Sequence, residues 1–303
     1  MAAVTLPVKT GHTPVPSRRP TFASTLWRVL RRKPSRMIGF VILVFFALLA
    51  IFGPMLYPSP LPINSSLIYA GPSWAHPLGT DFEGTDVLAL VVTGGRYILF
   101  SAFLAALFTI AIGTGVGLIS GYYRGFADSA LMRVTDFILT LPQFPFLVVL
   151  STVSHFGSPI LLGLVLGVTG WGGMARAVRS QTLSLRERGF VESVQGLGLS
   201  SGHIIVREVL PNVAPYVAMN LLISITGAIY AESGLFFLGL LPYSTNNWGV
   251  MLYNAFYQAG VMYTRQAVLY LLAPLIAILL VTLGVVLVLD AADELLNPRL
   301  REV

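Results

Sequence analysis

Long apolar runs alternate with shorter polar stretches along most of the chain. A helix needs about 20 apolar residues to cross the hydrocarbon core of a bilayer, and six runs come close to that length. They are Met37–Leu56, Tyr97–Ser120, Phe137–Val153, Pro159–Ala175, Tyr216–Leu241 and Ala267–Leu289. Because these runs are continuous and do not alternate with polar residues, they predict helices and not the strands of a barrel. We therefore expect an all-α membrane protein with six transmembrane helices.

The composition also indicates a membrane protein. Hydrophobic residues make up 55% of the 303 residues and charged residues 11%. Soluble domains carry roughly 25% charged residues, so water is not the main solvent of this chain. The first apolar run is too long for the hydrophobic part of a signal peptide and is predicted to stay as an anchor. The chain has no cysteine, which excludes disulfides, thiol catalysis and cysteine-based metal sites.

Basic residues are distributed unevenly over the polar stretches. Residues 1–36 hold many Lys and Arg and no acidic residue, and the stretches 121–136 and 176–215 are also basic. The stretches 57–96 and 242–266 contain a single arginine each. Because Lys and Arg concentrate on the cytoplasmic side of membrane proteins, both termini are predicted to be cytoplasmic. Membrane orientation then explains the net charge of +6, and no nucleic-acid partner is expected.

The predicted organisation is a tail, an anchor, an external segment and a helical core. Residues 1–20 are expected to be disordered. Phe22, Leu26 and Leu30 share a helical face, which suits a helix bound to membrane lipid at the headgroups, and an ordinary basic flank fits equally well. The parts are a basic cytoplasmic tail at 1–36, the first transmembrane helix at 37–56, an external segment at 57–96, a five-helix core at 97–290 that includes the cytoplasmic loop 176–215, and a cytoplasmic tail at 291–303.

The pattern within the loop 176–215 predicts a first short helix. Phe190, Val194 and Leu197 fall on one helical face. Gly198 follows directly and can end the helix, because glycine adopts the left-handed conformation at little cost. The apolar face of this helix then needs a partner, either the membrane surface or another protein.

A second short helix is expected after the first. Ser200 is placed to cap it, and it runs from His203 to Leu210. Pro211 is expected to stop it, because proline cannot continue a helix without losing a hydrogen bond. The product is a helix–turn–helix that faces the cytoplasm.

These residues carry a resemblance to a known family. Glu192 followed by Gly198, with Leu210 and Pro211 twelve residues further on, resembles the "EAA loop" of permease subunits in ABC importers. The resemblance implies that the loop forms a coupling helix that docks in a cleft of an ATPase subunit. The sequence departs from the usual pattern at Ser193 and Val194, where alanines are usual, and at Glu208, where an apolar or basic residue is usual.

Other segments resemble the C-type subunit of dipeptide/oligopeptide importers. They cover nearly everything after residue 25 and read "RRKPSRMIGFVILVFFALLAIFGPMLYP", "HPLGTDFEGTDVLALVVTGGR", "GYYRGFADSALMRVTDFILTLPQFP", "WGVMLYNA" and "DAADELLNPRLR". The second segment has Thr85 where a basic residue is usual. The resemblance implies the type I ABC importer permease fold in the cell membrane, and a solute that is a di- or oligopeptide, an oligosaccharide or nickel.

The resemblance also implies partners and a set of coupling residues. A second, homologous permease subunit, two ATP-binding subunits and an external substrate-binding protein would complete the transporter. ATP and magnesium would be bound by those partner subunits, because this chain lacks a phosphate-binding G-x-x-x-x-G-K-[ST] loop, and no enzymatic activity is expected of it. The residues expected to couple it to the ATPase are Arg188, Phe190, Glu192, Val194, Leu197, Gly198, Leu199 and Ser200.

Five further polar residues are candidates for function. His76, Asp81 and Asp86 lie in the external segment. Together with Glu83 they could form a metal site, but roles in capping, in shaping turns and in contacting the binding protein are preferred, and no metal is expected. Glu232 in the fifth run either lines the pathway or its gate, or bonds inside the bundle. Asn220 is open in the same way, with a hydrogen bond between helices preferred.

Two features bear on packing, and two other functions stay in view. Glycines recur every four residues in the second and fourth runs, and they predict close helix packing inside the chain or a dimer seam; Pro142 and Pro145 are expected to kink the third run. The first alternative function is an ion-coupled secondary transporter, which needs buried acids or broken helices in matching halves. The second is an intramembrane enzyme, for which the spans show no paired acid, histidine or metal set.

Overall fold

The computed structural model describes residues 22–57, 61–153, 158–241, 246–258 and 267–296. Within these ranges the regular structure is helical apart from one isolated bridge between Thr80 and Asp86. The prediction of an all-α protein is therefore confirmed. The expected disordered tail and most of the C-terminal tail lie outside the described residues.

Four helices are long and apolar enough to cross a membrane unaided: α2, α3, α12, and α10 together with the turns that precede it. Their bounds are Pro34–Leu56 for α2, Val87–Tyr123 for α3, Leu210–Phe237 for α10 and Val268–Leu296 for α12. Two further crossings are bent pairs: α4 (Gly125–Thr140) with α5 (Gln143–Val153), and α6 (Pro159–Gly170) with α7 (Gly172–Arg186). Counting each pair as one gives up to six spans by length and composition.

The bends have local causes. Leu141 joins α4 to α5 in an extended conformation, and the following Pro142 disfavours the helical conformation for the residue before it. The axes of α4 and α5 differ by 78°, which confirms the kink expected at Pro142, whereas Pro145 lies in the first turn of α5 and does not break it. At the second break, glycines flank Trp171 on both sides and the axes differ by 49°, in line with the tendency of helices to kink where small residues meet.

Two of the polar stretches between the predicted spans contain helices. The stretch 121–136 forms the end of α3, a turn with positive φ at Arg124 and Gly125, and most of α4. Its charged residues are compensated between helices, since the Arg179 guanidinium of α7 donates to Asp128 of α4 at 2.5 and 2.6 Å. The helix that leads into the third span therefore begins earlier than the predicted Phe137, because α7 supplies partners for its charged residues that the sequence did not reveal.

Of the second stretch, 242–266, the structure describes residues 246–258, which include the short helix α11 (Trp248–Tyr253). The indole of Trp248 is fully buried and donates to the Val91 carbonyl of α3 at 2.8 Å. Helix α11 packs against the bundle because burying a tryptophan removes a large apolar surface from water, with its N–H satisfied.

Glycine packing holds α3 at the centre of the bundle, where it contacts α7, α6 and α10. A Cβ atom added at Gly113, Gly117 or Gly121 would come within 2.7 Å of side-chain atoms of α7. Gly163 and Gly167 of α6 face the backbone of α3 in the same way. The expectation that these stripes pack inside the chain is confirmed.

The N-terminal helix α1 (Phe22–Arg32) packs on the chain itself. Leu30, one of the three apolar residues for which a headgroup helix and an ordinary basic flank were both open, is buried with Ala291 and Leu295 of α12. The exposed side carries Trp27 and Arg31, whose guanidinium lies 4.4 Å from the Trp27 ring centroid. The apolar helical face of this segment therefore includes a residue, Leu30, that contacts protein, because the end of α12 provides an apolar surface for it.

Candidate functional site

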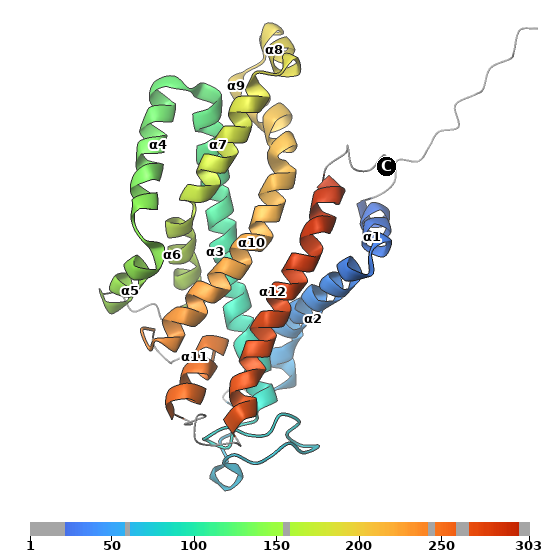
Figure 1. Cartoon of the computed structure of the whole chain (residues 1–303), viewed down its shortest axis with the longest axis vertical. Helices are drawn as coiled ribbons and strands as arrows, with labels where there is room; N and C mark the ends of the chain where they lie inside the picture. The colour runs from blue at the N-terminus through green and yellow to red at the C-terminus, as the bar shows by residue number, and fades with distance from the viewer. Residues whose placement is uncertain (1–21, 58–60, 154–157, 242–245, 259–266, 297–303) are drawn as a thin grey trace, which may run out of the picture.

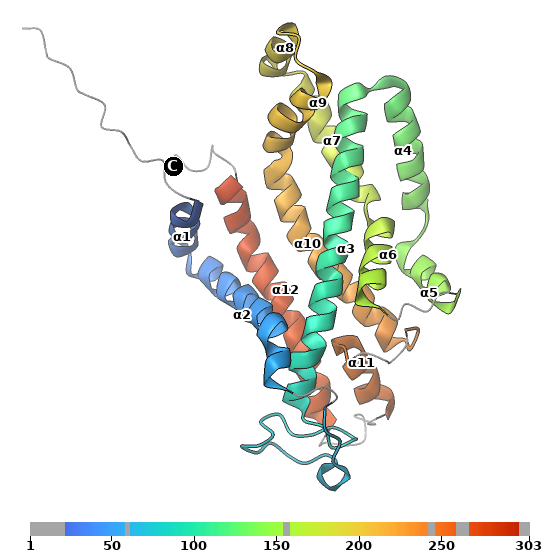
Figure 2. The same cartoon turned by 180° about the vertical axis from the view of Figure 1, so that it is seen from behind.

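The segment between α7 and α10 protrudes from one end of the bundle. It consists of α8 (Gly189–Gly196), a turn, and α9 (Ser201–Ile204). Figures 1 and 2 show α8 beyond the ends of the neighbouring helices, whereas α11 and residues 61–86 lie at the opposite end. All the residues expected to couple the chain to a partner therefore lie on one projecting element and the turns beside it.

The turn between α8 and α9 has the expected geometry. Gly198 has a φ of +76°, in the left-handed region where glycine is favoured. Its N–H donates to the Gln195 carbonyl at 2.9 Å and closes the end of α8. The Ser200 side chain caps α9 by accepting from the His203 N–H at 3.4 Å.

The second helix continues where the sequence predicts a stop. After α9, a π turn spans Ile205–Val209. The N–H of Leu210, the residue that follows, donates to the Ile205 carbonyl five residues back. The helix then runs on through Pro211 into α10. A π turn is wider than an α turn, so it carries the chain past a proline that lacks an N–H. The stop expected at Pro211 was therefore wrong.

The apolar residues of the loop divide into an inner and an outer set. Val191 is fully buried, in a cluster with Tyr122, Leu185 and Ile204, and Val194 is half-buried against the same cluster. The outer set is exposed and comprises Phe190, Leu197, which is 78% exposed, and Leu199. Val191 was not among the residues predicted from the sequence, and its pairing with Val194 at i and i+3 is the signal that would have found it.

The charged residues of α8 face solvent. Arg188 precedes the helix and Glu192 lies in its first turn, and both side chains are exposed. Among the described residues, neither side chain has a hydrogen bond or ion pair. Both are therefore free to bond to another molecule, together with the outer apolar set.

The external candidates form a compact turn at the start of α3. Asp86 caps α3 by accepting from the Ala89 N–H at 3.0 Å, and its other oxygen lies 2.7 Å from His76 Nδ1. Asp81 is buried and accepts from the N–H groups of Thr85 and Glu83. Burial raises the pKa of Asp81, and those backbone hydrogen bonds oppose the rise. In this structure all three residues have partners within the turn.

Glu232 lies inside the bundle. It is 1% exposed, and its carboxylate accepts from Ser101 of α3 and from the Asn247 amide at 2.6 Å. Asn247 in turn caps α11. Asn220 donates to the Tyr216 carbonyl of its own helix at 2.9 Å, so the preferred bond to another helix is wrong.

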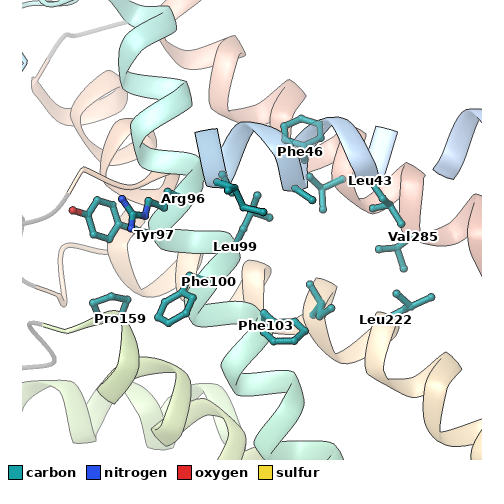
Figure 3. A pocket seen from close by; sticks show the side chains of 15 residues that line it. Leu43, Phe46, Arg96, Tyr97, Leu99, Phe100, Phe103, Pro159, Leu222 and Val285 are labelled. Carbon is teal, nitrogen blue, oxygen red and sulfur yellow. The ribbon is translucent and has the colours of Figure 1, made fainter. Parts of the chain in front are cut away.

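A large apolar groove of about 870 Å³ opens between α2, α3, α6, α10 and α12. Figure 3 shows Phe100, Phe103 and Leu222 on its walls, with Arg96 and Tyr97 toward one side. Apart from those two residues its lining side chains are hydrocarbon. Such a surface suits lipid chains or another apolar helix and not a polar solute.

Two family models match the chain, one over its C-terminal two thirds and one near its N-terminus. A family model described as "Binding-protein-dependent transport system inner membrane component" matches residues 113–302. A second, described as "N-terminal TM domain of oligopeptide transport permease C", matches residues 21–72.

Similar proteins cover most of the chain. The dipeptide transport system permease protein DppC of Bacillus subtilis (strain 168) is 34% identical over 241 residues, which is 77% of this chain and 74% of that protein. DppC of Alkalihalophilus pseudofirmus is 30% identical over 310 residues, covering 97% of this chain and 100% of the relative. The oligopeptide transport system permease protein OppC of Haemophilus influenzae is 33% identical over 237 residues, covering 75% of this chain and 76% of the relative.

A solved structure shares the fold. A chain from "Inward facing conformations of the MetNI methionine ABC transporter" superposes with a TM-score of 0.50 at 17% identity. The match covers 67% of this chain and 96% of that chain.

Proposed function

Because the chain belongs to the family of binding-protein-dependent transport system inner-membrane components, as a C-type permease of the dipeptide/oligopeptide group, we propose that it forms half of the pathway of an ATP-driven peptide importer. The family is that of multi-pass inner-membrane permeases, and the expected type I importer permease fold is confirmed. The observation that carries the proposal is the family match over residues 113–302, which includes the protruding α8.

The α8 loop would receive force from an ATPase subunit. Phe190, Leu197 and Leu199 would fill an apolar cleft, and Arg188 and Glu192 would bond at its edge. These side chains are exposed on the free chain, and burying them in a partner would release water from apolar surface. ATP and magnesium would be bound by that partner and not by this chain.

The structure also supports a route for the motion. Val191 anchors α8 in the cluster that joins α3, α7 and α10. The helix from α9 through the π turn into α10 is continuous, so a push on the loop displaces a whole span instead of bending a linker. Rigid displacement of helices is a common way to carry a conformational change between sites. When the ATPases close, the spans would rock between inward- and outward-facing states.

The solute is proposed to be a peptide. The sequence resemblance left oligosaccharides and nickel open, and the similar proteins are named for dipeptides and oligopeptides. A second permease would supply the other half of the pathway. A substrate-binding protein would deliver the peptide to the external end, where His76, Asp81 and Asp86 shape the turn that meets it.

Reconstitution tests the proposal. The chain, co-expressed with candidate partner subunits, is purified and placed in proteoliposomes with a peptide-loaded binding protein. The expected result is co-purification with two nucleotide-binding chains and peptide uptake that needs ATP. Uptake by this chain alone, driven by a proton or sodium gradient, would establish the secondary-transporter alternative and overturn the proposal.

A further inference from the structure

A small polar pocket lies where the two broken helices meet. It has a volume of about 160 Å³ and is lined from α3, α5, α6 and α10. Its polar side chains are Thr109, Gln143 and Ser224, and two glycines, Gly170 and Gly227, leave room between them. None of these lining residues, all in the described part of the chain, is charged.

The pocket lies at the depth of the membrane interior. Thr109 is near the centre of the apolar run Tyr97–Ser120, and Ser224 is near the middle of α10. Gln143 Nε2 reaches Thr169 Oγ1 at 3.4 Å, which links the start of α5 to the end of α6. Figures 1 and 2 show α5 and α6 between the α8 end and the α11 end of the molecule.

Polar groups at this depth need hydrogen-bond partners, because lipid offers none. Interrupted helices are tolerated inside a membrane where the backbone is buried in protein or lines a water-filled cavity. Gln143 is exposed, and its single bond to Thr169 is long. The Ser224 hydroxyl has no hydrogen-bond partner among the described residues. Nothing lies within 4 Å of a Cβ added at Gly227, so the pocket is open on that side.

We propose that this pocket binds the main-chain amides of a peptide as it crosses the membrane, a role that rests on the proposed function. The Gln143 amide both donates and accepts, as a peptide unit does, and the Ser224 hydroxyl does the same. The Thr109 hydroxyl donates to the Gly167 carbonyl at 3.4 Å and can accept from a peptide N–H. Main-chain amides are common to all peptides. A pocket that contacts only these groups, through uncharged side chains, accepts peptides whatever their side chains. At about 30 Å³ per water molecule the pocket holds roughly five waters, so it takes part of a peptide at a time.

The test uses the reconstituted transporter with its ATPases, second permease and peptide-loaded binding protein. Uptake of a tripeptide is compared with uptake of the same peptide methylated on its main-chain nitrogens, each preloaded at saturation. The variants are Gln143→Leu, Gln143→Asn and Ser224→Ala. Thr226→Val serves as the control, because Thr226 lies on α10 outside the pocket and bonds to its own helix.

The loss of one hydrogen bond predicts about a fivefold lower uptake of the unmodified tripeptide for Gln143→Leu. The preference for the unmodified over the methylated peptide should fall by a similar factor, while Gln143→Asn keeps much of that preference and Thr226→Val behaves as the wild type. Any selection by the binding protein is common to all variants and cancels in this ratio. If the ratio of unmodified to methylated peptide uptake is unchanged in both Gln143→Leu and Ser224→Ala, the inference is overturned. Peptide uptake by the wild-type transporter in the same experiment would still support the proposed function. The inference is also overturned if the second permease no longer co-purifies with the Gln143→Leu variant, because that result would show that Gln143 bonds to the second permease and not to the peptide.

Discussion

At the scale of single residues, Glu232 shows how a buried acid is used inside this bundle. Its carboxylate accepts from Ser101 of α3 and from Asn247, the cap of α11, so one side chain of α10 connects three helices. The acid was visible in the sequence as an ionisable residue in an apolar run. Its two partners were not, because they lie 131 and 15 residues away along the chain.

Replacing Glu232 tests this connection. Glu232→Ala leaves the buried Asn247 amide without its acceptor, which costs about 2 kcal/mol, so Tm in detergent should fall by several degrees. Glu232→Gln keeps an acceptor oxygen and should lose less than half as much. Asn220→Ala removes a bond within one helix and is the control, with a small effect. A Glu232→Ala variant as stable as the wild type would show that the network does not hold α11.

At the scale of elements, the contact between α3 and α7 depends on glycine. A Cβ at Gly117 would lie 2.6 Å from the Val178 Cβ and 2.7 Å from the Ala175 carbonyl oxygen. Two residues earlier on the same helix, Gly115 has nothing within 4 Å. The four-residue spacing predicted which glycines pack closely, because residues four apart lie on one helical face.

This pair gives a matched experiment on helix packing. Gly117→Ala forces α3 and α7 apart and should lower the free energy of unfolding by about 1–3 kcal/mol. Gly115→Ala should leave it unchanged or raise it, since alanine favours helix more than glycine does. Thermal unfolding of the two purified variants measures the difference, and equal Tm values would mean that the stripe does not set the packing distance.

Other elements could not be predicted from the pattern alone. The sequence located the turn at Gly198 and the cap at Ser200 because both depend on local backbone chemistry. It did not reveal that α9 runs on into α10, because a π turn at Ile205–Val209 has no clear sequence signal. It also misplaced the inner face of α8, since Val191 is defined by the cluster it meets and not by the loop itself.

At the scale of the whole molecule, the two ends differ in kind. Figure 1 shows α8 at one end and residues 61–86 with α11 at the other. The α8 end has exposed apolar and charged side chains. Basic residues at the α8 end predict that this end is cytoplasmic. The chain has no cysteine, so a single introduced thiol reports the side on which it lies.

Thiol labelling tests the orientation. Trp74→Cys, at a fully exposed position of the external segment, should react with a membrane-impermeant maleimide in intact cells. Ser193→Cys on α8 should react only after the membrane is permeabilised, because the reagent cannot reach the cytoplasm. Labelling of the Ser193→Cys variant in intact cells would show that α8 lies outside the cell, where it could not contact a cytoplasmic ATPase.

The most direct test of coupling through α8 is peptide-stimulated ATP hydrolysis by the reconstituted complex carrying Leu197→Asp. Leu197 is 78% exposed, so the substitution should leave the spans folded while it places a charge in the proposed cleft. The control is Phe126→Asp, at an exposed position on α4 outside the loop. If α8 couples the chain to the ATPase, Leu197→Asp abolishes peptide-stimulated hydrolysis and uptake while the control retains both. Full stimulation and uptake in Leu197→Asp would contradict that coupling.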